Sequence, residues 1–530
     1  TNTHSLLPGS TAIDAGDAGL LPADDLDLDG DLDTAESLPQ DQRGEARIRG
    51  GGLDIGAFEA GNVAVTVSET QDPTAAGETF DVTATVAVIA GAGTPTGTVQ
   101  LTDDQGDFAP IDLTLPPSGV VTFSGVSLST LGVHDLTVSY SGDGSFDAVQ
   151  SGQSHKVIVY LDVTKTEDTS DGICNSDCSL REAVVAANAA STEAILRIPA
   201  GTYPLTLDGA DEDLGETGDL DLNNPDHAIS IIGAGDDATI IDASAVSDRV
   251  VHIVTGDVHI EGVTITGGSA STGDGGGILA SGRLLLNNSV VSDNTAENGG
   301  GLHVAKGGGD AIVNNSSITE NTASNRGGGI DAIVITVANS TLAGNVGDIG
   351  GGIYSRALNL QNSTFSSNSA SSHGGAVWVA SNSAISNSTF AGNTAPGGAN
   401  IYNVRGTTTV NNSILADGNC HAAVRRSQIV GSSNLGADSS CAVTGVLTGF
   451  DPVLRDNGGA TVTHVLFSGS SALDSGDNNL IPSDVTDLDG DGDTSEPLPL
   501  DQRGQARIQN GTVDIGAVEG VGDVSLSAVA

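Results

Sequence analysis

A glycine-rich phrase recurs through the middle of the chain, and it restricts the available folds more than any other feature. The phrase is GGGI or a close variant, and its copies begin at residues 275, 299, 327, 350, 374 and 397. The steps between copies are 24, 28, 23, 24 and 23 residues. A period near two dozen residues, with short β segments in each period, is typical of a parallel β-helix. In that fold each coil buries its apolar face only against its neighbours.

An asparagine phrase, Asn-Ser or Asn-Thr in most copies, lies between successive glycine phrases, and a second asparagine follows it in most periods. Asparagine tolerates the left-handed backbone conformation, and its amide can bond to its own copy one coil away. We therefore expect a structural amide ladder at Asn288, Asn315, Asn339, Asn362, Asn387 and Asn412. Several of these residues also lie in N-x-S/T sequons, so glycosylation is the alternative, but the regular spacing favours the ladder.

Residues 62–160 have a different pattern, with short runs in which apolar and polar residues alternate. Examples are residues 63–67, 80–86 and 135–140, with Gly, Pro and Asp between the runs. Period-2 alternation indicates antiparallel strands, and a module of this length fits a β-sandwich. The predicted fold is therefore all-β: an Ig-like β-sandwich at 62–160 and a right-handed parallel β-helix with an N-terminal cap at 161–460.

The chain also repeats itself at an offset of 460 residues. Residues 1–59 align with 461–519 without a gap, so that Asp14 matches Asp474, Gln42 matches Gln502 and Glu59 matches Glu519. We interpret residues 1–61 as the closing segment of a preceding repeat and 461–521 as a second closing segment. Residues 522–530 then begin the next Ig-like module. This order predicts a tandem-repeat array.

Three stretches resemble segments of bacterial surface proteins. Residues 178–188, CSLREAVVAAN, resemble the CSLREA segment at the start of β-helix regions. Residues 140–159 resemble the last hairpin of bacterial Ig-like repeats. The closing segment, with DQRG at 501–504 and DIGAVE at 514–519, resembles the choice-of-anchor Q region. Together these resemblances imply a secreted, surface-attached β-helix. We also expect a short helix that begins near Arg181 and caps the open end of the β-helix.

Charge and cysteine content limit the partners and the compartment. The formal net charge is −50, which argues against nucleic acid and anionic membranes as partners, because both need a basic surface. No run of 18 apolar residues occurs, so we expect no membrane insertion in this segment. The cysteines form two sequence-close pairs, Cys174 with Cys178 and Cys420 with Cys441. They predict two disulfides and an extracellular or cell-surface location.

Two acidic loops, at 25–36 and 485–496, follow the spacing of an EF-hand-like Ca²⁺ loop. Carboxylates this dense repel one another unless a cation neutralises them. In the second loop Val485 takes the first position, so Asp484 or Asp491 must compensate. The expected Ca²⁺ ligands are Asp25, Asp27, Asp29, Asp31, Asp33 and Glu36, and Asp484, Asp487, Asp489, Asp491, Asp493 and Glu496. A third, less regular acidic stretch supplies the further candidates Asp211, Asp213, Asp219 and Asp221.

These features predict a structural repeat unit of a secreted, Ca²⁺-stabilised filament or giant cell-surface stalk. Its partners are copies of itself, joined head to tail, or neighbouring repeats in one chain. A glycan-binding adhesin that recognises surface glycans is the alternative, although Trp378 is the only tryptophan.

A polysaccharide lyase or hydrolase is the second alternative, because the pectate-lyase-like fold of the β-helix hosts many such enzymes. Residues 262–415 contain only seven acids and five bases, with no Asp-Asp or Asp-x-Asp pair, and His303 and His373 have no acidic neighbour in sequence. We therefore expect no catalytic residues, although residues one coil apart become neighbours in space.

Overall fold

The computed structural model describes residues 15–25, 37–41, 47–48, 53, 55–56, 63–89, 94–142, 146, 148–209 and 212–520. The chain divides into two compact units, Thr1–Val159 and Tyr160–Ala530. This division lies one residue before the predicted boundary between β-sandwich and β-helix. Within the described ranges no helix is both long enough and apolar enough to cross a membrane.

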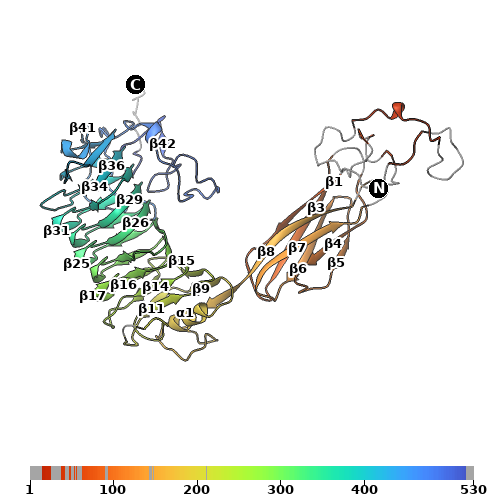
Figure 1. Ribbon diagram of the computed structural model, residues 1–530, viewed down its shortest axis with the longest axis horizontal. Coiled ribbons are helices and arrows are strands. Elements are labelled where there is room, and N and C mark those ends of the chain that lie inside the picture. Colours follow the sequence, from red (N-terminus) through yellow and green to blue (C-terminus); the bar gives the residue numbers. More distant parts are fainter. Residues whose placement is uncertain are drawn as a thin grey trace, which may run out of the picture. The chain divides into compact units, whose positions relative to one another are not determined.

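The first unit contains an Ig-like β-sandwich, as predicted (Figure 1). One antiparallel sheet has the order β1–β3–β6, and in the other β4 pairs with β5 and β7, and β7 pairs with β8. Both sheets contribute to one apolar core that includes Val82, Phe123, Leu101 and Leu136. The strands are β1 (Val63–Glu69), β2 (Thr74–Ala75), β3 (Thr79–Val88), β4 (Thr98–Asp103), β5 (Ile111–Thr114), β6 (Val120–Ser127), β7 (Gly132–Tyr140) and β8 (Val149–Asp162). The 3-10 helix η1 (Ala18–Leu20) precedes them.

The second unit is a right-handed parallel β-helix, also as predicted, and its coils add strands to three parallel sheets (Figure 1). In the part of the chain that the structure describes, one of these sheets has eleven strands. They are β10 (Gly201–Pro204), β13 (Thr239–Asp242), β16 (Thr264–Thr266), β20 (Val290–Ser292), β24 (Ser317–Thr319), β27 (Thr341–Ala343), β30 (Thr364–Ser366), β34 (Thr389–Ala391), β37 (Ile414–Leu415), β40 (Leu435–Gly436) and β41 (Gly445–Val446).

The other two sheets of the β-helix meet at the glycine corners. The shorter sheet consists of β17 (Ser269–Asp274), β21 (Thr295–Asn298), β25 (Thr322–Arg326), β28 (Val346–Ile349) and β31 (Ser369–His373). The longer sheet consists of β9 (Ala194–Ile198), β11 (Leu220–Asn223), β12 (Ile229–Gly233), β14 (Val251–Thr255), β15 (Asp257–Glu261), β18 (Ile278–Ala280), β19 (Arg283–Asn287), β22 (Leu302–Val304), β23 (Ala311–Asn314), β26 (Ile330–Ala338), β29 (Ile353–Gln361), β32 (Val377–Val379), β33 (Ser383–Ser386), β35 (Ile401–Asn403), β36 (Gly406–Asn411), β38 (Cys420–Ala422) and β39 (Ser427–Ser432).

The glycine phrases form a tight corner at which successive coils lie in close contact. Gly327 has a φ of +62°, a conformation that costs residues with a Cβ more than it costs glycine. A Cβ on the next residue, Gly328, would lie 2.4 Å from the carbonyl oxygen of Val346. The glycines therefore align because the corner has no room for side chains. Inside the helix, aliphatic residues stack in register and are buried, among them Ile278, Leu302, Ile330, Ile353, Val377 and Ile401.

The second asparagine of each period forms a continuous buried amide ladder. The Nδ2 of each of these residues except the last donates to the Oδ1 of the copy in the next coil, at 2.9–3.1 Å. The same Oδ1 also accepts the backbone N–H of the residue before it in the ladder. Every Nδ2 donates again to a carbonyl of the preceding coil. The ladder consists of Asn294, Asn321, Asn345, Asn368 and Asn393.

The first asparagine of each period was the predicted ladder position, and there the structure differs. All six residues have the left-handed conformation, with φ between 46° and 53°: Asn288, Asn315, Asn339, Asn362, Asn387 and Asn412. Only Asn362 and Asn339 are joined directly among them, by an Nδ2···Oδ1 bond of 2.6 Å. The left-handed turn aims these amides away from the stacked column, so that the continuous ladder runs through the second asparagine.

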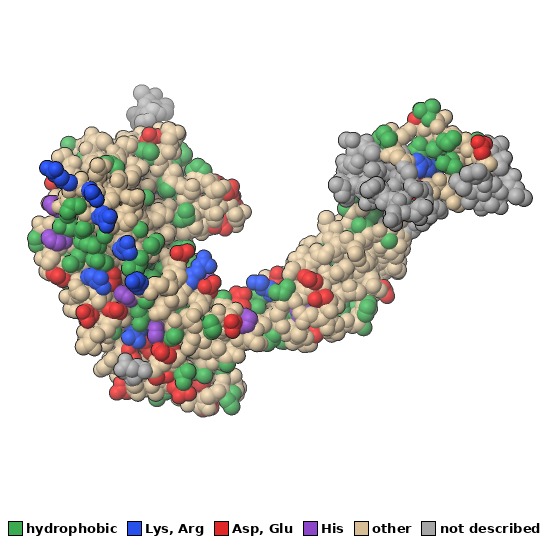
Figure 2. All heavy atoms as spheres, in the orientation of Figure 1, with side chains coloured by type: hydrophobic (Ala, Val, Ile, Leu, Met, Phe, Trp, Pro, Cys, Tyr) green, Lys and Arg blue, Asp and Glu red, His purple; other side chains and the backbone are tan. Residues whose placement is uncertain are grey.

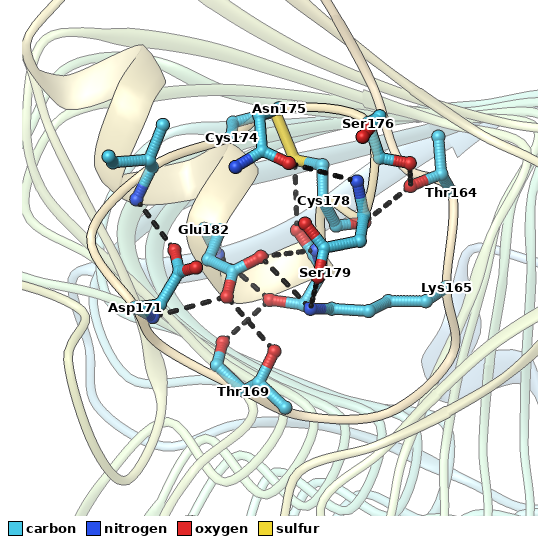
Figure 3. The surroundings of a disulfide bond; sticks show 12 residues. Thr164, Lys165, Thr169, Asp171, Cys174, Asn175, Ser176, Cys178, Ser179 and Glu182 are labelled. Carbon is cyan, nitrogen blue, oxygen red and sulfur yellow. Dashed lines mark hydrogen bonds and ion pairs between the residues drawn. A yellow bond between two sulfur atoms is a disulfide. The ribbon is translucent and has the colours of Figure 1, made fainter.

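The expected helix, α1 (Leu180–Asn188), lies at the N-terminal end of the β-helix beside β9 and β11 (Figure 1). It begins with a capping box in which Ser179 and Glu182 each bond to the other's backbone N–H. Just before it, Cys174 and Cys178 form the predicted disulfide (Figure 3). Glu182 also accepts hydrogen bonds from the Thr169 hydroxyl and the Asp171 N–H. These contacts fasten the preceding loop to the helix and cover the first coil.

The other end of the β-helix carries the second predicted disulfide and the closing segment. Cys420 of β38 is bonded to Cys441 of the 3-10 helix η2 (Ser439–Cys441). The closing segment then runs back along the side of the β-helix. It contains the 3-10 helix η3 (Asn478–Leu480) and a hairpin of β42 (Ile508–Gln509) and β43 (Thr512–Val513).

Replacing a central residue of the ladder should destabilise the β-helix strongly. Asn345→Ala removes the acceptor of the Asn321 amide and backbone N–H, and leaves those buried donors unpaired. We expect a loss of about 3 kcal/mol in the free energy of unfolding. The matched change Asn359→Ala lies on the outer face of β29, where no side-chain hydrogen bond to a described residue is formed, and should cost no more than about 0.5 kcal/mol. Equal losses of unfolding free energy in the two variants, measured by urea unfolding, would show that the ladder does not stabilise the stacking of the coils.

Candidate functional site

The second acidic loop is held at both ends, and its carboxylates converge. Its base is closed by the Asp484 N–H, which donates to the Glu496 carbonyl at 2.8 Å, and by an antiparallel bridge between Ser483 and Pro497. Asp484 is fully buried, and its carboxylate accepts the Leu488 N–H at 2.7 Å. Asp487 has a φ of +50°, which turns the chain sharply inside the loop.

Five of the six predicted ligands in this loop come together as two overlapping groups. Ligand oxygens lie within 4.8 Å of one another in each group. One group is Asp484, Asp489 and Glu496, and the other is Asp487, Asp489 and Asp491. Burial, together with the charges of the surrounding aspartates, raises the pKa of Glu496, and its buried Oε1 has no hydrogen-bond partner among the described residues.

The sixth predicted ligand, Asp493, does not join these groups. Its Oδ1 accepts the Ser495 hydroxyl at 2.6 Å and the Ser495 N–H at 2.9 Å. These hydrogen bonds lower the pKa of Asp493. Asp493 therefore stabilises a turn within the loop, although its sequence position is that of a ligand.

The other predicted acidic sites are described only in part. In the first loop only Asp25 lies inside the described residues, while Asp27, Asp29, Asp31, Asp33 and Glu36 lie outside them, as does Asp211 of the third stretch. In the third stretch the ligand atoms of Asp213 and Asp221 meet His252, all within 4.8 Å of one another. The histidine belongs to β14, one coil away from Asp221, so its sequence position gives no sign of this contact.

Asp219, the remaining candidate of the third stretch, points into a different environment. Its Oδ2 accepts a hydrogen bond from Arg249 at 2.9 Å. Burial raises the pKa of Asp219 to about 7, with a further contribution from the charges of Asp221 and Asp248. Asp219 is therefore a buried carboxylate paired with an arginine, and it lies outside the group formed by Asp213, Asp221 and His252.

The closing segment docks on the β-helix through buried polar side chains. The Nε2 of Gln502 donates to the Ser340 carbonyl at 3.1 Å and to the hydroxyls of Thr341 and Thr461 at 2.9 Å. Its Oε1 accepts the Thr364 hydroxyl at 2.7 Å. Gln502 therefore joins β27 and β30, which come from adjacent coils, to the segment that begins the second copy of the duplicated sequence.

Arg507 is the second docking residue and is fully buried. Its guanidinium donates to Asn362 Oδ1 at 2.9 Å and to the carbonyls of Ala517, Asp514 and Gly516. It also lies 3.3 Å from a carboxylate oxygen of Glu519. Asn362 donates in turn to the Leu500 carbonyl. The left-handed asparagines thus bind the closing segment.

The outer face of the β-helix carries a column of side chains that sequence reasoning missed. His303, Asp331, Tyr354, Trp378, Tyr402 and His421 occupy equivalent positions in successive coils. The rings of Tyr354 and Trp378 stack at 4.1 Å, and those of His373 and Tyr402 at 4.3 Å. Part of the signal was present in the sequence, because His303, Asp331, Tyr354 and Trp378 each lie four residues after the start of a glycine phrase.

His303 and His373 therefore have close partners in space. His303 Nδ1 lies 3.1 Å from Asp331, and its Nε2 lies 3.7 Å from Asp274. Arg326 lies 3.4 Å from the same Asp331 oxygen. Two cationic or polar groups thus surround the nearly buried Asp331 carboxylate, as in a compensated structural ion network.

Comparison with known proteins supports one of the resemblances found in the sequence. A family model described as a bacterial Ig-like domain (group 3) matches residues 65–159, the region of the β-sandwich. No curated protein and no solved structure matches the chain. The resemblances of residues 178–188 and of the closing segment therefore rest on their sequence motifs alone. An Ig-like domain with a β-helix indicates a bacterial surface or structural protein.

Gln502 should be essential for docking of the closing segment. In Gln502→Leu the Thr341, Thr364 and Thr461 hydroxyls and the Ser340 carbonyl lose a buried partner, which should cost about 2–4 kcal/mol. Hydrogen exchange of residues 461–519 reports the loss directly. The exposed neighbour Gln505 is a matched control, and Gln505→Leu should leave exchange unchanged. Unaltered protection in Gln502→Leu would refute this docking role.

Proposed function

We propose that this chain is a structural repeat unit of a secreted, Ca²⁺-stabilised extracellular filament or giant cell-surface stalk. The observation that carries the proposal is the docking of residues 461–519 on the side of the β-helix through Gln502 and Arg507. The same sequence occurs 460 residues earlier, with Gln42 and Arg47 at the matching positions. A duplicated segment that closes a β-helix in this way is what a tandem array of such units requires.

The contacts between successive coils of the β-helix support a scaffold role. Each coil of its central region is joined to the next by backbone ladders, by the asparagine ladder and by aliphatic stacking, so a load along the axis is shared among many contacts. Disulfides near both ends of the β-helix favour an oxidising, extracellular location. Bacterial Ig-like modules, to which residues 65–159 are similar, suit a spacer between such units.

Calcium is the cation that best suits the second acidic loop. Its donor atoms are carboxylate oxygens, the hard ligands that Ca²⁺ prefers. The unpartnered Oε1 of Glu496 and the raised pKa of this residue both reflect negative charge that lacks compensation. A bound divalent cation would offset that repulsion and hold the loop against Asn339, whose amide contacts Thr486 at 3.4 Å.

A non-enzymatic role fits the chemistry of the described outer face better than catalysis. The carboxylate nearest to a histidine there, Asp331, is nearly buried and shared with Arg326, so it is poorly placed to act as a general base. Glycan binding remains the second candidate function, and the exposed arginines Arg356 and Arg405 favour it.

Calcium should raise the melting temperature, and removal of Asp489 should abolish this effect. Asp489 belongs to both groups of converging carboxylates, whereas Asp493 bonds to Ser495. Differential scanning calorimetry with Ca²⁺ and with EDTA should show stabilisation of the wild type, of several degrees. The control Asp493→Asn carries the same charge change in the same loop and should keep the response, while Asp489→Asn should lose most of it. A wild-type melt that EDTA does not shift would count against Ca²⁺ binding.

Native protein should form elongated assemblies, because units joined head to tail need not close into a ring. Electron micrographs of material purified without denaturant should show filaments or stalks several units long. Isolated single units at all concentrations, with Ca²⁺ present, would contradict the filament or stalk proposal.

A further inference from the structure

One edge of the β-helix concentrates basic side chains in a strongly acidic chain. Residues 349–430 contain four arginines and a single acidic residue, Asp417, whereas the whole chain has a net charge of −50. The basic side chains lie along the corner at which the longer sheet bends, on every second coil from Lys306 to Arg405 and on the coil that follows. We call this set the basic ridge, and it consists of Lys306, Arg356, Arg405, Arg425 and Arg426. Figure 2 shows Lys and Arg side chains in a line over the β-helix with hydrophobic side chains beside them.

Ion pairs within the described part of the protein do not account for the basic ridge. All five residues are exposed, and within the described part of the chain none lies within ion-pair distance of a carboxylate. Other exposed arginines do have such partners, among them Arg197 with Asp162 and Arg455 with Asp451. Lys306, Arg356 and Arg405 lie on every second coil, about 9.6 Å apart at about 4.8 Å per coil, and Arg425 and Arg426 lie on the coil after Arg405, so that these like charges repel one another. An anionic partner would remove this repulsion.

A groove of about 510 Å³, lined by apolar side chains together with hydroxyl and amide groups, lies next to the basic ridge on the outer face of β26, β29, β33 and β36. Arg356 directly precedes Ala357, which lines the groove, and Arg405 lies two residues before Thr407, which also lines it. Hydroxyl and amide groups dominate the polar part of the lining: Thr336, Asn359, Asn382, Ser383, Thr407 and Thr409. Such groups suit a ligand that is rich in hydroxyls.

The groove lies on one side of the basic ridge, and a column of aromatic rings lies on the other side. We call this the aromatic column, and it consists of Tyr354, Trp378, Tyr402 and His421. Tyr354 and Arg356 are two residues apart on β29 and therefore point to the same face of the strand. The rings of Tyr354 and Trp378, and those of Tyr402 and His421, stack on one another along the column. Their stacked faces are therefore covered, and mainly ring edges and polar ring atoms are available to a ligand.

We propose that the basic ridge and this groove bind an acidic polysaccharide that lies along the axis of the β-helix. The arginines would pair with its carboxylate or sulfate groups, and the threonines and asparagines of the groove with its hydroxyls. The coil spacing repeats these contacts along the axis, as the sugar residues of an extended chain repeat. A single-stranded nucleic acid would instead need free aromatic faces for its bases.

Binding to acidic and neutral glycans tests the proposal directly. Calorimetric titration at low salt, without divalent cations, would compare a polygalacturonate oligomer, chondroitin sulfate and a dextran oligomer of similar length. We expect binding to one or both acidic chains, weakening as salt rises, and none to dextran. The carboxylate and sulfate arms identify which anionic group is recognised.

Two double variants with the same change in net charge distinguish the contribution of the basic ridge to binding from that of overall charge. Arg356→Gln/Arg405→Gln should weaken binding about tenfold or more. The control Arg197→Gln/Arg455→Gln makes the same charge change outside the ridge and should bind as the wild type does. Asn359→Val/Thr409→Val removes polar groups from the groove at constant charge and should also weaken binding.

Four results would overturn the proposal: no binding of either acidic chain by the wild type, equal binding of dextran, equal loss in the two arginine pairs, or no effect of the groove variant. Sedimentation velocity tests whether the ridge instead binds a second copy of the chain. Self-association that Arg356→Gln/Arg405→Gln abolishes, without glycan binding, would assign the ridge to that contact. The test is independent of Ca²⁺ and of filament formation, so its failure leaves the proposed structural function unaffected.

Discussion

The β-helix depends on hydrogen bonding between identical side chains one coil apart. A buried asparagine has two donors and one acceptor oxygen, and in the ladder each of these groups is used. Asn345 accepts from Asn321 on one side and donates to Asn368 on the other. This arrangement works only when the coils stay in register, because a shift of one residue would leave several buried amides unpaired. The ladder therefore specifies the stacking of the coils as well as stabilising it.

The two asparagines of each period have different partners, and this difference explains how the closing segment is held. The second asparagine points inward and bonds to its own copies. The first has the left-handed conformation, and in three coils its amide bonds to the closing segment. Asn339 contacts Thr486, Asn362 contacts Leu500 and Arg507, and Asn412 contacts Asp477. The closing segment thus bonds to the regular repeat of the β-helix, whose spacing matches its own polar groups.

Sequence predicted the features that depend on local periodicity. The glycine corners, the left-handed asparagines and both disulfides follow from residue type and spacing along the chain, whereas α1 was expected together with the resemblance of residues 178–188. Contacts between coils were harder to predict, because the partners are far apart in sequence: Asp274 lies 29 positions before His303, and Asp331 lies 28 positions after it. The same limit explains why the ladder was predicted at the wrong asparagine of each period. Residue type allows a ladder at either asparagine, and only the direction of the side chain shows which of the two forms it. Spacing also assigned Asp493 a ligand position, although a neighbouring serine competes for its carboxylate.

The distribution of charge follows from the same architecture. A β-helix places one position of every coil in a single column, so a few substitutions at one corner create a line of charge. The acidic residues of the described chain are numerous at the N-terminal cap and in the loop at 484–496, whereas the basic ridge has few acidic neighbours in sequence. Interactions between exposed charges are screened beyond about 8 Å at physiological ionic strength. The ridge can therefore attract an anionic chain locally even though the protein as a whole is strongly negative, and this local attraction must weaken as salt concentration rises.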